Sequence, residues 1–245
     1  MIARSLPLTR LMGAERRLDK VWYLTRINLF AGIGESEMQR VAERATMRAF
    51  DRGKVILHPG QRQELVYLIK EGRVKLSRYS SDGREQILTL LEPGDVFGEF
   101  ALVEKAEPVH VEAIEDTLIC ALNRGDFLTL VRRQPEVMLA VVKVLAERLR
   151  VAEEEIADLA FQDVPGRLAS LLLRLGEAYG ERDGGGLRLT LRLTHQDIAS
   201  MIGATRETVT STLSRFRDAG LIVTEHRYIV IRNPEGLRRL TQRER

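Results

Sequence analysis

The sequence contains a single cysteine, Cys120, among its 245 residues. One thiol cannot close an internal disulfide, and an iron–sulfur cluster needs several thiolates, so both are excluded. No stretch approaches 18 uncharged apolar residues, and Arg4, Pro7 and Arg10 interrupt the amino-terminal segment. The sequence therefore predicts no membrane span and no signal peptide, and we expect a protein of the reducing cytoplasm without a membrane partner.

Catalytic chemistry also finds little support in the residues. The four histidines are scattered, and neither a phosphate-binding glycine loop nor a pair of nucleophile and base is visible. We expect no catalytic residue, no bound metal and no cofactor, and hence a protein that is not an enzyme. The 44% hydrophobic and 30% charged residues are typical of a globular chain, and the length suffices for two modest domains.

Lysine is absent from residues 163–245, which contain 14 arginines and 10 acidic residues. The rest of the chain has 24 basic and 25 acidic residues, so the basic excess lies in the carboxy-terminal third. This asymmetry favours a nucleic-acid-binding surface at that end of the chain. The excess is mild, and a solvated exterior is the alternative interpretation.

The first half of the chain has the pattern of a β-rich domain. Between Phe50 and Leu122, short apolar segments alternate with turns such as Pro59-Gly60 and Asp82-Gly83, which predicts an antiparallel sandwich or roll. Residues 21–48 predict a short helix, a glycine turn and a second helix that Ser36 caps. Residues 1–20 carry five basic and two acidic side chains and are interpreted as an amino-terminal arm, for which disorder is one interpretation.

A long helix is predicted over residues 134–162. Its apolar residues follow one another at alternating steps of four and three, which is the narrow seam of a coiled coil. A helix that packs only on its own roll would need a wider apolar stripe, and Val137, Val141 and Val144 can face the roll at the same time. We therefore favour a parallel dimer whose seam consists of Met138, Val142, Leu145, Leu149, Ala152, Ile156 and Leu159.

Residues 163–245 predict a winged helix-turn-helix domain. A helix is expected over residues 167–180, and the alternating segment LRLTLRL (187–193) predicts a strand. Thr194 and Asp197 form a capping pattern, Gly203 ends that helix, and Thr205 caps the next one, which is helix-turn-helix spacing. The segment LIVTEHRYIVI then predicts a hairpin wing.

The second helix of this motif carries side chains suited to the major groove. If Val209 and Leu213 face the core, its outer face presents arginines, a glutamate and hydroxyls. Arginine can bond guanine O6 and N7, and glutamate can accept from a cytosine amino group. A capped Thr-Arg-Glu at a solvated helix start is the alternative. The candidate DNA-binding residues are Thr194, His195, Thr205, Arg206, Glu207, Thr210, Ser211, Ser214 and Arg217.

Two long motifs, GRVKLSRYSSDGREQILTLLEPGDVFGEF (72–100) and LTHQDIASMIGATRETVTSTLSRF (193–216), lie on either side of the long helix. From about Leu29 onward the chain resembles the cyclic-AMP receptor protein and fumarate-nitrate regulator (CRP/FNR) family of bacterial transcription factors. The resemblance implies an α+β fold with an amino-terminal cyclic-nucleotide-binding-type β-roll (a double-stranded jelly roll), a long dimerisation helix and a carboxy-terminal winged helix-turn-helix. We expect these parts at residues 1–20 (arm), 21–133 (roll), 134–162 (dimerisation helix) and 163–245 (DNA-binding domain).

The resemblance also implies partners and residue roles. It implies a homodimer that binds a palindromic operator in double-stranded DNA and contacts RNA polymerase. Arg206 and Glu207 match the family's pair that reads a G·C step. Ser211 stands where the cyclic-AMP-type members carry another arginine, so the rest of the half-site remains undefined.

The same resemblance allows a test for cyclic AMP. Gly98 and Glu99 match the family's Gly-Glu, and Glu99 could bond either a ribose hydroxyl or its own loop. The family's arginine for the cyclic phosphate is missing, because Pro108 and Val109 stand there and Lys105 is the nearby cation in the sequence. A buried phosphate without that partner forgoes roughly 1.5–3 kcal/mol. We therefore predict that cyclic AMP is not the effector.

Other sensing chemistry has weak candidates. His110 is the one histidine in the expected pocket that could bind a haem, although a packing role is favoured, and Cys120 lies in an apolar strand where redox sensing is not expected. The possible effector pocket consists of Gly98, Glu99, Val109 and His110.

The sequence thus predicts a homodimeric transcription regulator, with activation suggested by family habit, that needs no ligand or binds one other than cyclic AMP. The main alternative is a small-molecule receptor whose DNA binding requires such a ligand. A protein-interaction module without DNA contact is a third hypothesis.

Overall fold

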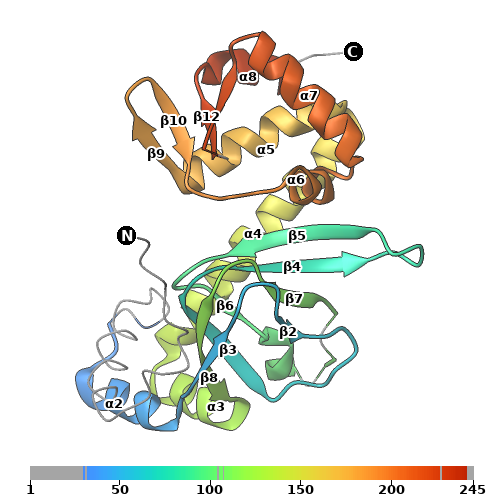
Figure 1. The fold of residues 1–245 in the computed structure, drawn as a ribbon. Helices are drawn as coiled ribbons and strands as arrows, with labels where there is room; N and C mark the ends of the chain where they lie inside the picture. The colour runs from blue at the N-terminus through green and yellow to red at the C-terminus, as the bar shows by residue number, and fades with distance from the viewer. Residues whose placement is uncertain (1–29, 31, 104, 107, 227, 242–245) are drawn as a thin grey trace, which may run out of the picture. The chain divides into compact units, whose positions relative to one another are not determined.

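The structure is a computed structural model that describes residues 30, 32–103, 105–106, 108–226 and 228–241 (Figure 1). The chain divides into two compact units. The first contains the described residues up to Arg78 together with Leu88–Arg148, and the second contains Tyr79–Ile87 and the residues from Leu149 onward. The expected arm over residues 1–20 and the first predicted helix lie outside the described residues.

The first unit is built on two four-stranded sheets, which confirms the predicted β-roll. One sheet has the order β1 (Thr46–Phe50), β8 (Thr117–Asn123), β3 (Leu65–Glu71) and β6 (Val96–Phe97). The other has the order β2 (Val55–Leu57), β7 (His110–Ala113), β4 (Val74–Tyr79) and β5 (Glu85–Leu91). Alternate side chains of the strands form a shared apolar core that includes Ile69, Leu76, Phe97, Val111 and Ile119. Cys120 is buried in β8.

Helices complete the first unit: α2 (Glu35–Arg44), the 3-10 helix η3 (Glu99–Val103), α3 (Arg124–Arg133) and the start of α4 (Pro135–Phe161). The prediction that Ser36 caps a helix is wrong, because α2 begins at Glu35 and Gly34 precedes it without a side-chain cap. Two acidic residues in the first turn of α2 complement the helix dipole instead. Helix α3, which was not predicted from the sequence, is capped by Asn123, whose side chain accepts from the Gly125 amide at 2.8 Å.

Helix α4 packs on the first unit through the valines that the sequence assigned to this role. Val137 and Val141 are buried in one cluster with Phe127 and Leu130 of α3, and Val144 packs against that cluster. The helix runs from Pro135 to Phe161, close to the predicted residues 134–162, because the apolar steps of four and three continue without a break from Met138 to Leu159.

The second unit combines α5 (Val164–Tyr179), α6 (His195–Ile202), α7 (Arg206–Asp218) and α8 (Pro234–Thr241) with one antiparallel sheet. The sheet has the order β11 (Ile222–Glu225), β12 (Tyr228–Ile231), β10 (Gly186–Leu189) and β9 (Gly180–Asp183). Helix α5 contacts each of the other three helices, which places it at the centre of the unit (Figure 1). Among the described residues, every helix is too short or too polar to cross a membrane.

The strand predicted over residues 187–193 is wrong in its second half. Strand β10 ends at Leu189, and Thr190 bonds the main-chain oxygen of Tyr179 through both its amide and its hydroxyl, at 2.9 and 3.0 Å. The alternating pattern continues beyond Leu189, but the neighbouring strand β12 pairs only with Leu187 and Arg188. The chain from Thr190 onward therefore leads into α6 as an irregular segment.

Candidate nucleic-acid interface

Helices α6 and α7 are joined by a short turn that their end residues determine. The Thr194 hydroxyl accepts from the Asp197 amide at 3.0 Å, and the Asp197 carboxylate accepts from the Thr194 amide at 2.8 Å, which is a complete capping box. Gly203 ends α6 with φ 61°, in the left-handed region that a Cβ atom disfavours. Thr205 then caps α7 by accepting from the Thr208 amide at 3.2 Å. The predicted helix-turn-helix is confirmed.

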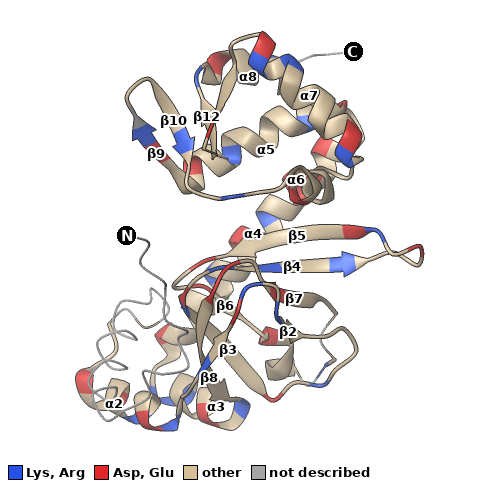
Figure 2. Ribbon diagram, viewed as in Figure 1, with Lys and Arg blue, Asp and Glu red and all other residues tan. Residues whose placement is uncertain are grey.

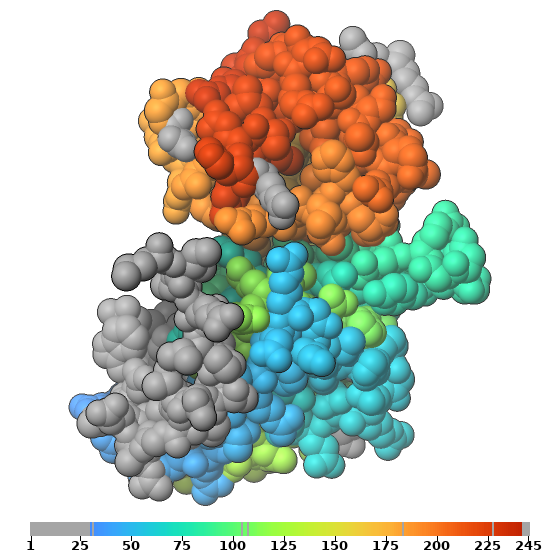
Figure 3. All heavy atoms as spheres, viewed as in Figure 1, coloured from blue at the N-terminus to red at the C-terminus, as the bar shows by residue number. Residues whose placement is uncertain are grey.

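Helix α7 has one buried and one exposed face. Val209 and Leu213 are buried, as predicted, together with Thr212 and Phe216. Its exposed face carries Arg206, Glu207, Thr210, Ser211 and Arg217, with Ser214 half-buried beside them. Figure 3 shows α7, in orange, at the surface of its unit, and Figure 2 shows opposite charges side by side at its start. The structure therefore brings these six candidate residues onto one helix face.

Some polar groups on this face form hydrogen bonds within the chain. The Thr210 hydroxyl donates to the Arg206 main-chain oxygen at 2.8 Å and also lies 2.8 Å from His195 Nδ1. Arg217 Nη2 donates to the Ser214 hydroxyl at 3.2 Å. The side chains of Arg206, Glu207 and Ser211 form no hydrogen bond or ion pair within the part of the chain that the structure describes. They are the groups with unused bonding capacity at the start of α7.

A basic residue that the sequence analysis missed lies beside this motif. Arg192, in the segment that leads into α6, donates from Nε to the Tyr228 hydroxyl at 2.8 Å, and its Cζ lies 4.9 Å from the Tyr228 ring centroid. Arg188 lies 5.3 Å from the same ring and pairs with Glu181 at 3.1 Å. The hydrogen bond and the stacking both position the exposed Arg192 against Tyr228. The hydrogen bond uses Nε and neither of the two Nη groups. Its only sequence signal was the repeated arginine of LRLTLRL.

The carboxy-terminal half of α4 is joined by ion pairs to α5, the helix that packs against α6 and α7. Arg174 of α5 pairs with Asp158 at 2.9 Å and with Glu155 at 3.4 Å. Burial raises the pKa of Glu155, and the Arg174 charge opposes this rise. Gln86 lies in the part of β5 up to Ile87 that belongs to the second unit, and it donates to the Met201 main-chain oxygen at 3.1 Å. The base of the motif is thus held by several elements.

The predicted seam of α4 is largely uncovered in the single chain. Leu149 is 60% exposed and Ile156 66% exposed, and Val142, Leu145, Ala152 and Leu159 are exposed as well. Met138 differs from the rest because it is partly buried against the core of the first unit. Leu139, one residue away, is exposed instead, and so is Phe161 at the end of the helix. Such a row of uncovered apolar side chains is typical of a helix that contacts another chain.

The expected effector pocket contains a cation that the sequence analysis missed. Arg148 of α4 lies with its Nη1 3.7 Å from Glu99 Oε1 and donates from Nη2 to the Val96 main-chain oxygen. The sequence had suggested Lys105 as the only nearby cation, and the structure shows that Arg148 lies beside Glu99 as well. Gly98 has φ 80°, and a Cβ there would lie 2.8 Å from the Leu65 oxygen, so glycine is required beside Glu99.

The two other residues assigned to this pocket, Val109 and His110, pack against neighbouring side chains of the roll. Val109 is buried in the apolar core of the roll. His110 lies edge-on to His58, with ring centroids 5.3 Å apart. Within the described residues, no three His, Cys, Asp or Glu side chains gather in a way that could hold a metal ion.

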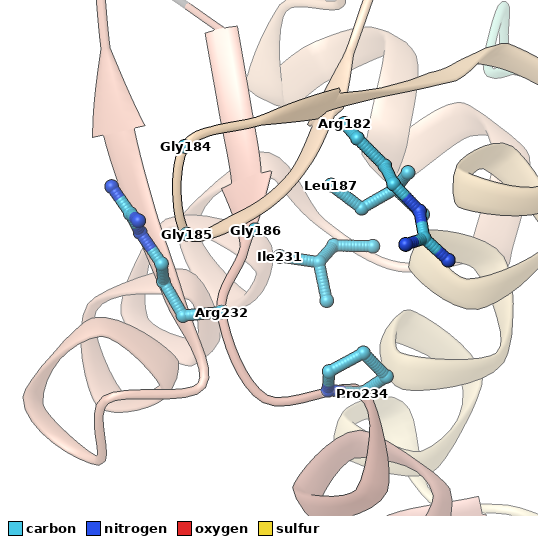
Figure 4. A pocket seen from close by; sticks show the side chains of 8 residues that line it. All are labelled: Arg182, Gly184, Gly185, Gly186, Leu187, Ile231, Arg232 and Pro234. Atoms are coloured by element: carbon cyan, nitrogen blue, oxygen red, sulfur yellow. The ribbon is translucent and has the colours of Figure 1, made fainter.

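A separate hollow lies between the β9–β10 turn and the start of α8 (Figure 4). Leu187, Ile231 and Pro234 supply its apolar lining, the turn glycines lie beside them, and Arg182 and Arg232 flank it. Arg232 pairs with Glu225 at 2.9 Å. The hollow contains none of the residues that the sequence assigned to a site.

Two family models match the chain. The Crp-like helix-turn-helix domain matches residues 166–240, and the cyclic nucleotide-binding domain matches residues 47–134. The capped helix-turn-helix and the two-sheet roll are the parts of the structure that fall in these ranges.

Curated proteins and solved structures agree with the family models. The chain is 34% identical over 217 residues to a protein of Mycobacterium tuberculosis named CRP-like cAMP-activated global transcriptional regulator, which covers 88% of this chain and 97% of the relative. It is 33% identical to the global nitrogen regulator of Synechocystis, over 85% of this chain and 92% of the relative. A solved transcriptional regulator of the CRP/FNR family from Thermus thermophilus is similar with a TM-score of 0.68 and 29% identity, over 81% of this chain and 99% of that chain. The chain belongs to the CRP/FNR family of transcription regulators.

Proposed function

We propose that this regulator is a homodimer that binds a palindromic operator through Arg206 and Glu207, activates transcription by recruiting RNA polymerase, and does so without cyclic AMP. The observation that carries the proposal is the pair of exposed side chains, Arg206 and Glu207, in the first turn of a capped α7. Residues in the first turn of the second helix are those that reach base edges in helix-turn-helix complexes. Recruitment of the polymerase rests on the family resemblance.

The dimer is supported by the uncovered seam of α4. Burial of each large apolar side chain contributes about 1.5–3 kcal/mol, so two copies that cover this row gain substantial stability. The seven-residue repeat favours a helix that pairs with itself. A dimer would present two α7 helices, and a palindrome is the operator that such symmetry requires. In this proposal residues 21–133 form the roll, 134–162 the dimerisation helix and 163–245 the DNA-binding domain.

Independence from cyclic AMP is supported by the surroundings of Glu99. Its carboxylate already has Arg148 as a charged partner. Val109, one of the two residues at the expected position of the phosphate partner, has its side chain in the apolar core. A cyclic nucleotide would have to compete with this internal ion pair and would find no guanidinium at residues 108–109.

The deciding experiment is selection of bound duplexes from a random DNA pool by the purified protein with no effector added. We expect recovery of a palindrome whose half-sites share a G·C step. The Arg206→Ala protein, run in parallel, should lose enrichment at that step. Recovery of no enriched sequence by the intact protein would contradict ligand-independent recognition, and absence of any duplex binding would contradict the DNA-binding function itself.

A second candidate is a receptor whose DNA binding requires a bound anion. The observation in its favour is Arg148 Nη1, which is buried and donates no hydrogen bond within the described residues. The Mycobacterium tuberculosis relative is named as cAMP-activated, so cyclic AMP belongs among the compounds tested. A true ligand at 100 times its Kd adds about 2.7 kcal/mol to the stability of the folded protein. Thermal unfolding with cyclic AMP, other nucleotides and small organic acids therefore separates the two candidates.

A further inference from the structure

His195 and Thr210 connect the two helices of the DNA-binding motif. His195 is the first residue of α6, and Thr210 lies on the exposed face of α7. Their contact, with Nδ1 2.8 Å from the hydroxyl oxygen, places the His195 ring beside the helix face that carries Arg206. Both side chains are exposed in the described chain.

The hydrogen bonds of Thr210 are linked to which nitrogen of His195 carries hydrogen. A threonine hydroxyl has one hydrogen, and Thr210 donates it to the Arg206 main-chain oxygen at 2.8 Å. With the hydroxyl hydrogen on the Arg206 oxygen, Nδ1 is the donor in the contact between Thr210 and His195. In a neutral imidazole the other nitrogen, Nε2, is then an acceptor, and in an imidazolium it is a second donor. Nε2 makes no hydrogen bond to any residue that the structure describes.

We propose that His195 is a proton-linked DNA contact: binding of DNA draws one proton from solvent onto Nε2, which then donates to a backbone phosphate oxygen. The proposal rests on the proposed DNA-binding function and adds to it a dependence on pH. A neutral Nε2 offers a lone pair to an anionic oxygen, which is repulsive, whereas the imidazolium offers a charge-assisted hydrogen bond. Phosphate therefore selects the protonated form.

The charged groups around His195 leave the phosphate as its anionic partner. On its own segment the neighbours are Arg192 and Asp197, and the Asp197 carboxylate is already occupied by the Thr194 amide and hydroxyl, at 2.8 and 2.7 Å. On α7 the exposed charged residues are Arg206, Glu207, Arg215, Arg217 and Asp218. From α5, Arg167 bonds the opposite end of α6, at Ile202. Among the described residues, no carboxylate bonds the His195 ring.

The contact would carry no sequence information, because a phosphate is the same at every base pair. A rise in proton concentration should therefore strengthen binding to operator and to random duplex by a similar factor. Each bound proton makes the logarithm of the association constant rise by up to one for each unit by which the pH falls. Two copies of His195 act in a dimer, and we expect operator affinity to rise at least roughly tenfold between about pH 8 and about pH 6.

The test measures fluorescence anisotropy of a labelled duplex that carries the selected palindrome, at fixed ionic strength across this pH range. We expect the intact protein to show the rise, His195→Gln to bind with a nearly flat profile, and His195→Arg to bind tightly at every pH. His226→Gln is the matched control, because His226 is an exposed histidine of the wing turn, and its profile should equal that of the intact protein. Thermal unfolding of each variant verifies that the fold is intact.

Two results would overturn the inference while leaving the DNA-binding function in place: a flat profile for the intact protein, or an equally steep profile for His195→Gln. If no protein binds the duplex at any pH, the proposed function fails instead.

Discussion

Arg167 of α5 donates from Nε to the main-chain oxygen of Ile202 at 2.9 Å. Its Nη1 donates to the main-chain oxygen of Gln162, also at 2.9 Å. Ile202 is the last residue of α6, and Gln162 follows the last residue of α4. One guanidinium thus satisfies oxygens at the ends of two helices, where the helices themselves offer no donor.

Replacement of the Arg167 side chain should lower the stability of the second unit. In Arg167→Ala the two main-chain oxygens lose this donor, and we expect the free energy of unfolding to fall by about 1–3 kcal/mol. Arg167→Lys keeps the charge but cannot direct two planar donors at separate oxygens, so it should recover only part of the loss. Denaturant unfolding measures both variants. Equal stability of Arg167→Ala and the intact protein would show that these bonds contribute nothing.

Arg206→Ala should cost about 1–3 kcal/mol of operator affinity and relax the preference at one G·C pair. The reason is that a bidentate arginine reads guanine directly, whereas its removal leaves the phosphate contacts in place. Titration of operator, of a duplex with that pair changed, and of random duplex measures the effect. A loss of the same size on all three duplexes would identify Arg206 as a phosphate contact instead.

Leu149→Glu should weaken the dimer and lower operator affinity with it. Leu149 is uncovered in the single chain, and a charge there would be buried against its copy in the proposed coiled coil. Lys143→Glu, at an exposed position off the seam, is the control and should remain dimeric. Sedimentation measures the assembly, and anisotropy measures the affinity. A dimeric Leu149→Glu protein would refute the seam.

Arg192→Ala should weaken binding to operator and random duplex alike. Its stacked pose suits a phosphate contact, and each phosphate contact that is lost reduces the slope of log affinity against log salt by about one. Tyr228→Phe removes the 2.8 Å hydrogen bond but keeps the ring, so its effect should be smaller. An unchanged salt slope in Arg192→Ala would exclude the contact.

We expect Asp95 to make the stability of the fold depend on pH in the acid range. Burial raises the pKa of this carboxyl, against the Glu92 amide bond and the Arg148 charge, which lower it. The folded protein therefore holds this proton more tightly than the unfolded chain, and the charged form costs stability as pH rises through the carboxyl range. Asp95→Asn removes that cost, so its stability relative to the intact protein should be greatest at neutral pH and shrink on acidification.

Asp82 is the control for Asp95, because its pKa is shifted in the opposite direction. A hydrogen bond from Ser80 lowers the pKa of the exposed Asp82, so its charged form favours the fold. Asp82→Asn should therefore be less stable than the intact protein at neutral pH, where the Asp82 carboxyl is charged, and the difference should disappear on acidification. Thermal unfolding of the variants at several pH values measures both trends, and the same pH dependence in Asp95→Asn as in the intact protein would contradict the assignment.

The sequence was informative where structure depends on neighbouring residues. The caps at Thr194 and Thr205, the turn at Gly203 and the apolar period of α4 all act within a few residues, so their patterns predicted the helix ends and the faces that the structure shows. The resemblance to a known family supplied the order of roll, helix and DNA-binding motif. Both kinds of signal identified the exposed face of α7.

The features that the sequence did not reveal depend on contacts between distant parts of the chain. Arg148 meets Glu99, and Arg192 meets Tyr228, only after the fold has formed, and neither pair has a spacing that a pattern could reveal. The strand expected beyond Leu189 has the right alternation but no neighbour to pair with, which shows that a strand is decided by its partner as well as by its own residues.

The burial of Cys120 inside β8 has a practical consequence. Its sulfur is shielded from reagents in water, and the chain has no second thiol. A cysteine introduced at an exposed position such as Lys143 would therefore be the one site that a maleimide dye reaches in the native protein. In the proposed dimer, the distance between two such dyes could then be followed while DNA is added, with no need to remove the natural residue first.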